Sequence, residues 1–191
     1  MSYLVLGLLL FLGTHSIRIV ADGWRTAQVG RLGLNRWKGL YSLVSALGLG
    51  LVVWGYGLAR AEPVALWAPP AWTRHLAALL TLPAFILIAA AYVPGSRIKA
   101  ALGHPMLAGV KVWAVAHLLS NGNLADALLF GAFLLWAVID FRSARQRDRA
   151  AGVSYRAGTA SRDGMVIAAG AGAWALFAGF LHLWLIGVRP Y

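Results

Sequence analysis

Long apolar blocks separated by short polar segments dominate the chain. The blocks lie at residues 3–20, 38–58, 73–93, 105–120, 123–141 and 164–186. Each is close to the ~20 residues that an α-helix needs to cross the hydrocarbon core of a bilayer. In lipid the backbone must satisfy its own hydrogen bonds, which favours helices over irregular structure. The pattern therefore predicts an all-α, polytopic membrane protein, with six transmembrane helices in a single domain spanning residues 1–191.

The fourth block is the shortest, and helix-boundary residues lie on both sides of it. His104 and Pro105 precede it, and proline fits the first turn of a helix because no backbone N–H is needed there. Asn121 and Gly122 follow it, and both residue types favour a helix end. The fifth block begins directly afterwards. We therefore expect these two helices to form a tight hairpin.

The distribution of lysine and arginine predicts the orientation in the membrane. Fourteen of the 17 lie in or beside the first, third and fifth connections: Arg18, Arg25, Arg31, Arg36, Lys38, Arg97, Lys99, Lys111, Arg142, Arg145, Arg147, Arg149, Arg156 and Arg162. The other three are Arg60, Arg74 and Arg189. Because cytoplasmic loops are enriched in these residues, we expect both termini to be extracytoplasmic. No basic residue precedes the first block, which predicts a retained helix rather than a cleaved signal peptide.

Composition excludes several functional classes. Only 12% of residues are charged, against about 25% in soluble domains. The net charge of +11 does not predict nucleic-acid binding, because the basic residues lie in short loops where membrane topology explains them. The absence of cysteine excludes disulfides, iron–sulfur clusters and a thiolate haem ligand. No phosphate-binding loop, metalloprotease motif or nucleophile–base pair is present, which excludes hydrolysis and phosphoryl transfer.

Small residues are frequent in the second and sixth blocks. They include Gly48, Gly50, Gly55 and Gly57 in the second and residues 168–173 with Gly179 in the sixth. In lipid such residues let two helices approach closely, which is the interpretation we favour. The alternative is a glycine-lined wall for a flat cofactor.

Two histidines fall at similar predicted depths in the membrane. At 1.5 Å per residue, His15 lies roughly 16 Å from the outer face and His117 about 12 Å from it. Two neutral imidazoles facing each other at that depth could supply both axial ligands of a haem iron. The alternative is that each is a buried side chain hydrogen-bonded to a neighbouring backbone or hydroxyl group. The spacing leaves both interpretations open.

Apolar side chains accompany both histidines on their predicted helix faces, as a porphyrin would require. They are Leu8, Phe11 and Leu12 beside His15, and Trp113 and Ala114 beside His117.

The remaining histidines are weaker candidates. His75 and His182 lie near predicted outer helix ends. His75 is expected to be interfacial, and His182 either is interfacial or lines an entry path. His104, at the cytoplasmic mouth of its helix, either caps that helix or contacts a lipid headgroup or a cofactor propionate. Asp140, beside Arg142, is expected to be a paired boundary residue rather than a proton relay.

Two motifs carry a resemblance over essentially the whole chain. They are H-S at residues 15–16 and H-P-M-L-x-G-x-x-x-W-x-x-A-H-L-L-x-N-G at residues 104–122. Both resemble the NnrU family of bacterial membrane proteins, which is named for a link to nitrite and nitric oxide reductase expression in denitrifiers. That family is related to 15-cis-ζ-carotene isomerase, a membrane haem b enzyme in which histidines of these motifs coordinate iron. The resemblance implies haem b with His15 and His117 as iron ligands.

The chain departs from the related sequences at two positions. The isomerase cysteine, which takes part in a ligand switch, falls on Ala114, so the resemblance implies simple bis-histidine ligation. Gly103 stands where related His-Pro motifs often carry arginine. A more distant similarity, to membrane methyltransferases of the isoprenylcysteine type, rests on the His-Pro helix start alone.

Three functions follow from these observations. The first is a haem b protein of the bacterial cytoplasmic membrane, with a redox or nitric-oxide-linked role in denitrification. The second is a haem-dependent cis–trans isomerase of an apolar, carotenoid-like polyene. The third is a haem-free assembly or structural factor whose histidines bridge helices. The expected partners are membrane lipid, haem, and either nitric oxide or a polyene.

Overall fold

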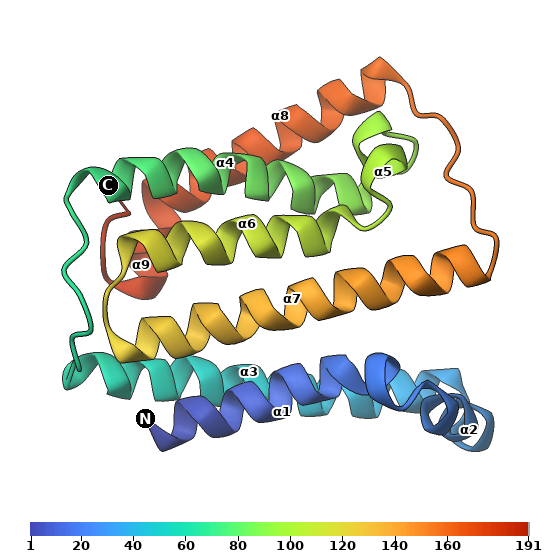
Figure 1. Cartoon of the computed structure of the whole chain (residues 1–191), viewed down its shortest axis with the longest axis horizontal. Helices are drawn as coiled ribbons and strands as arrows, with labels where there is room; N and C mark the ends of the chain where they lie inside the picture. Colours follow the sequence, from blue (N-terminus) through green and yellow to red (C-terminus); the bar gives the residue numbers. More distant parts are fainter. Residues whose placement is uncertain (191) are drawn as a thin grey trace. The chain divides into compact units, whose positions relative to one another are not determined.

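A computed structural model describes residues 1–190, which form helices joined by short connections (Figure 1). The helices are α1 (Ser2–Val20), α2 (Asp22–Leu32), α3 (Leu34–Ala61), α4 (Trp72–Tyr92), α5 (Arg97–Leu102), α6 (Pro105–Ser120), α7 (Leu124–Ala150), α8 (Ala160–Leu176), the π-helix η1 (Phe177–Leu181) and α9 (His182–Ile186). The chain divides into two compact units. The first contains Met1–Trp67 and Asn123–Ala132, and the second contains Ala68–Gly122 and the chain from Phe133 onwards. The predicted all-α class is confirmed.

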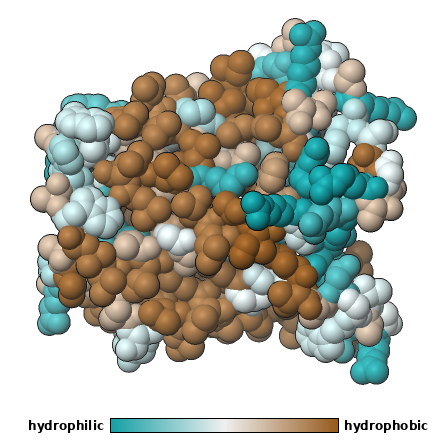
Figure 2. Space-filling model, in the orientation of Figure 1, coloured by the Kyte–Doolittle hydropathy of each residue, from teal (hydrophilic) through white to brown (hydrophobic). Residues whose placement is uncertain are grey.

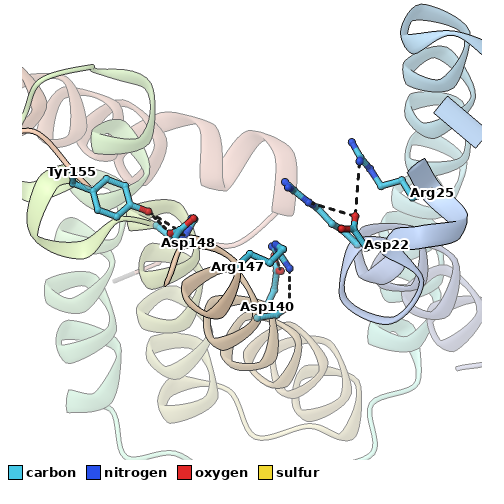
Figure 3. A network of polar contacts seen from close by, with 9 residues as sticks. Asp22, Arg25, Asp140, Arg147, Asp148 and Tyr155 are labelled. Carbon is cyan, nitrogen blue, oxygen red and sulfur yellow. Dashed lines mark hydrogen bonds and ion pairs between the residues drawn. The ribbon is translucent and has the colours of Figure 1, made fainter. Parts of the chain in front are cut away.

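All six predicted blocks lie in helices. The predicted and observed structures differ in the polar connections between them. The predicted first connection contains α2, where Asp22 pairs with Arg18 at 3.7 Å and Arg25 at 3.9 Å (Figure 3). The third contains α5, which Ser96 caps by accepting a hydrogen bond from the Lys99 backbone N–H. The expectation of a loop from residue 141 was wrong, because α7 continues to Ala150. Helix-favouring arginines and alanines extend it beyond its apolar part.

The outer surfaces of the long helices are apolar. Five helical segments are long and apolar enough to cross a membrane, and α6 is a shorter apolar helix. Leucines on three of them are largely exposed: Leu9 at 68%, Leu79 at 66% and Leu135 at 63%. Figure 2 shows hydrophobic side chains over much of the visible surface of the chain. A surface of this kind is stable in lipid and not in water, so the chain is a multi-pass membrane protein.

In the first unit, α1 packs closely against α3 (Figure 1). A Cβ atom added at Gly48 would lie 2.7 Å from the backbone nitrogen of Phe11, and one added at Gly55 would lie 2.2 Å from that of Leu4. These contacts confirm the helix-packing interpretation for both glycines. Gly57 has no such neighbour within 4 Å.

In the second unit, α4 packs against both α6 and α8 (Figure 1). Glycines again mark the contacts, because a Cβ atom at Gly109 would lie 2.8 Å from the carbonyl oxygen of Ala84. One at Gly170 would lie 2.5 Å from the Cα atom of Ile86. Backbone contact at these points brings α6, which carries His117, close to α4.

The start of α7 is held by a buried carboxylate in the first unit. Asp126, only 3% exposed, accepts hydrogen bonds from the backbone N–H and the amide of Asn123, both at 3.1 Å. Its other oxygen accepts one from the Tyr56 hydroxyl of α3 at 2.5 Å. The Leu124 N–H donates to the Val64 carbonyl at 2.8 Å. Asp126 therefore closes the first turn of α7 onto Asn123 and joins it to α3.

The Gly55→Ala substitution is expected to destabilise the α1–α3 pair by about 1–3 kcal/mol, because the new methyl group meets backbone rather than a movable side chain. Gly57→Ala is the matched control and is expected to be neutral or slightly stabilising, since it adds a helix-favouring residue in open space. Thermal unfolding in mild detergent measures both. Equal melting temperatures for the two variants would contradict the close packing.

Asp126→Ala is expected to lower the free energy of unfolding by about 1–3 kcal/mol, because it leaves buried donors without an acceptor. Tyr56→Phe removes one hydrogen bond and is expected to cost about 1 kcal/mol. Since the two side chains share a hydrogen bond, the double variant should cost less than the sum of the single costs. Additive costs in this double-mutant cycle would show that the bond contributes nothing to stability.

Candidate functional site

His15 is hydrogen-bonded to its own helix. Its Nδ1 lies 2.7 Å from the carbonyl oxygen of Phe11, one turn earlier in α1. A carbonyl oxygen only accepts, so Nδ1 carries the proton. The hydroxyl groups of Thr14 and Ser16 make the same bond to the carbonyl four residues before each, also at 2.7 Å. The three polar side chains in this apolar helix therefore find hydrogen-bond partners in the helix backbone and need no water.

The His15 imidazole packs among aromatic and polar groups of α1 and α3. Its ring centroid lies 4.2 Å from that of Phe11 and 5.3 Å from that of Tyr41, which meets it edge-on. Ser45 lies one turn beyond Tyr41 on α3, and among the described residues its buried hydroxyl has no hydrogen-bond partner. A buried hydroxyl without a partner costs free energy, which makes it a candidate contact for a polar group of a ligand.

His117 has the same local geometry as His15. Its Nδ1 lies 2.9 Å from the carbonyl oxygen of Trp113, one turn earlier in α6, and the two ring centroids are 5.1 Å apart. Asn121 then fixes the end of the helix, since both its backbone N–H and its side-chain amide donate to the His117 carbonyl at 2.9 Å. This confirms the predicted helix end at Asn121.

The shared geometry determines which nitrogen can bind a metal. With Nδ1 protonated and held by a carbonyl, the lone pair of each neutral imidazole is on Nε2. A histidine that ligates a metal through one nitrogen usually donates from the other to a carbonyl or carboxylate. His15 lies in the first unit and His117 in the second. Nε2 is therefore the nitrogen through which each histidine could ligate a metal.

The described residues contain no cluster of side chains that could hold a metal ion. Across residues 1–190, no group of three or more histidine, cysteine, aspartate or glutamate side chains meets that condition. A haem iron takes four ligands from the porphyrin and needs only one or two from the protein, and two histidines could supply those.

The other two residues of the predicted α6 site lie in apolar surroundings. The Trp113 ring meets that of Phe133 edge-on, with the centroids 5.7 Å apart. Ala114 is fully buried. No thiol is available at this position or elsewhere in the chain.

His104 is the N-cap residue of α6, as expected, although its side chain makes no capping hydrogen bond. Its Nε2 lies 2.6 Å from a carboxylate oxygen of Asp148 near the end of α7. The Tyr155 hydroxyl donates to the same oxygen, and Figure 3 shows it pointing at Asp148. Burial and the neighbouring carboxylate raise the pKa of Tyr155, so its hydroxyl keeps the proton that it donates. These two contacts with Asp148 join the residue before α6 to the end of α7 and to the connection that follows α7.

The remaining residues considered from the sequence take no part in the contacts described for His15, His117 and His104. Asp140 is paired as expected, but with Arg147 at 3.6 Å rather than with Arg142 (Figure 3). His182 is hydrogen-bonded to the Val188 carbonyl at 2.7 Å. His75 is exposed at the start of α4.

The expected helix end at residue 141 left Asp148 outside the helix that carries it, so its contacts with His104 and with Tyr155 of the following connection were missed. Sequence reasoning also missed the partnership of Tyr56 with Asp126, although the spacing of Asn123 and Asp126 is that of a capping box. That spacing was a usable signal for the start of α7.

Comparison with known proteins identifies the family. A family model described as NnrU protein matches residues 3–190. No curated protein and no solved structure matches the chain. The match extends over nearly every residue, including both histidine motifs. The chain therefore belongs to the NnrU family, which is linked to denitrification.

Proposed function

We propose that this protein binds haem b with His15 and His117 as axial ligands, and that it has a redox or nitric-oxide-linked role in denitrification. The observation that carries the proposal is the geometry that the two histidines share. Each donates from Nδ1 to the carbonyl four residues earlier and packs against the aromatic ring of that same residue. The proposal that His15 and His117 ligate the same iron rests on their similar predicted depth in the membrane.

The contacts of the two histidines are those expected of histidines that ligate a metal. The bond from Nδ1 to the helix backbone fixes the tautomer and the ring rotation, and it raises the basicity of Nε2. Bound haem supplies one-electron redox chemistry, with a potential set by these ligands and their surroundings.

Buried Ala114 supports a bis-histidine state. A thiolate at that position would offer a competing iron ligand, and an alanine cannot. The absence of cysteine from the whole chain means that no other residue supplies one. We therefore propose that His15 and His117 would both hold the iron, without competition from a thiolate of the protein.

Loss of either ligand is expected to remove the low-spin haem spectrum. His15→Ala and His117→Ala should each lack the sharp bands of the reduced low-spin protein. Absorption spectroscopy in mild detergent measures this. His75→Ala is the matched control, since that side chain is exposed and lies outside the site. Spectra that are unchanged in both ligand variants would refute the assignment of these histidines.

We also propose that the protein lies in the bacterial cytoplasmic membrane with both termini outside the cytoplasm. The distribution of basic residues supports this orientation. The natural absence of cysteine makes a direct labelling experiment possible, because single cysteines can be introduced at exposed connections. Glu62 and Ser154 are exposed residues on two connections with opposite expected locations.

A membrane-impermeant maleimide applied to intact spheroplasts is expected to label the Glu62→Cys variant and not the Ser154→Cys variant. Both should react once the membrane is permeabilised, which controls for access to each thiol. Labelling of Ser154→Cys alone in intact spheroplasts would invert the topology.

A further inference from the structure

Lys111 is a cation within an apolar helix, and an aromatic ring holds it. It is the sole lysine or arginine of α6. Its ammonium nitrogen lies 3.8 Å from the ring centroid of Phe141 on α7, well within cation–π range. A mobile lysine at a helix end would not be fixed in this way. The ring gives the charge a defined position.

No acidic side chain of residues 1–190 neutralises Lys111 by an ion pair. The two carboxylates that flank Phe141 along α7 are already engaged. Asp140 pairs with Arg147 at 3.6 Å, and Asp148 accepts from His104 at 2.6 Å. A cation in an apolar setting favours an external anion when internal ones are occupied.

The position of Lys111 suits an anion at the level of the lipid headgroups. It lies six residues beyond Pro105, or about 9 Å along the helix axis, and its long side chain can extend back toward the helix start. Arg145 lies one turn beyond Phe141 on α7, and its guanidinium packs beside Gly103 at the start of α6. A second cation therefore lies near the same end of the helix pair.

Exposed apolar side chains continue from Lys111 along the same face of α6. Val115 (40% exposed) and Leu119 (43%) lie one and two turns beyond it. These residues can contact acyl chains while Lys111 contacts the headgroup. A soluble anion would have no use for such a surface.

The geometry points to a binding site for the phosphate of an anionic phospholipid at Lys111 and Phe141, with its acyl chains along α6. Lysine attracts anionic headgroups, and the ring on Phe141 determines where the charge is presented. The site lies in the second unit, and it does not depend on haem.

The test compares lipid retention among three variants of the full chain. Protein reconstituted with phosphatidylglycerol and phosphatidylcholine is released into mild detergent, and bound lipid is counted by native mass spectrometry. Lys111→Gln is expected to weaken phosphatidylglycerol binding roughly fivefold, since one lysine near anionic lipid contributes ~1 kcal/mol. Phe141→Leu keeps the charge and removes the ring, and it is expected to weaken binding by about two- to fivefold.

Arg149→Gln is the matched control, because it removes one positive charge from an exposed position on the same helix. Its retention of phosphatidylglycerol is expected to equal that of the unmodified protein. Equal losses of phosphatidylglycerol binding in Arg149→Gln and Lys111→Gln would show that the lipid is attracted by net charge alone, and would overturn the proposed site. Displacement of the lipid by excess inorganic phosphate would assign the site to a soluble anion instead.

Discussion

The hydrogen bond from Nδ1 of a histidine to the carbonyl one helical turn earlier is the interaction on which this account depends. Both His15 and His117 make it, to Phe11 in α1 and to Trp113 in α6. In lipid, where no water is present, a polar side chain needs a partner from the protein. The helix backbone supplies that partner for Nδ1 and places the lone pair of a neutral imidazole on Nε2. One bond thus satisfies Nδ1 and fixes the tautomer of each ring.

The rest of the structure holds the two helices that carry these histidines. Gly48 and Gly55 of α3 let α1 approach to backbone contact, while Gly109 of α6 does the same against α4. Van der Waals contact of this kind replaces the hydrophobic effect, which does not drive helices together in lipid. Polar links lie near the helix ends, where Asp126 caps α7 and Asp148 joins His104 to Tyr155.

Periodicity and hydropathy predict most of this fold, because each apolar block must be a helix in lipid. They also predict the helix start at Pro105 and its end at Asn121. They do not predict that α7 continues to Ala150, since arginine-rich sequence is compatible with either a helix or a loop until its packing is known. The contact of His104 with Asp148 was missed for the same reason. Long-range partners depend on where an element ends.

The most direct measurement is an absorption spectrum of the protein purified in mild detergent, oxidised and then reduced, with a pyridine haemochrome assay for haem type. The account predicts a sharp Soret band with resolved α and β bands on reduction, which together indicate low-spin haem b with two histidine ligands. A protein that remains colourless after reconstitution with haem would contradict it. In that case the hydrogen bonds of His15 and His117 would serve only to bury two imidazoles within apolar helices.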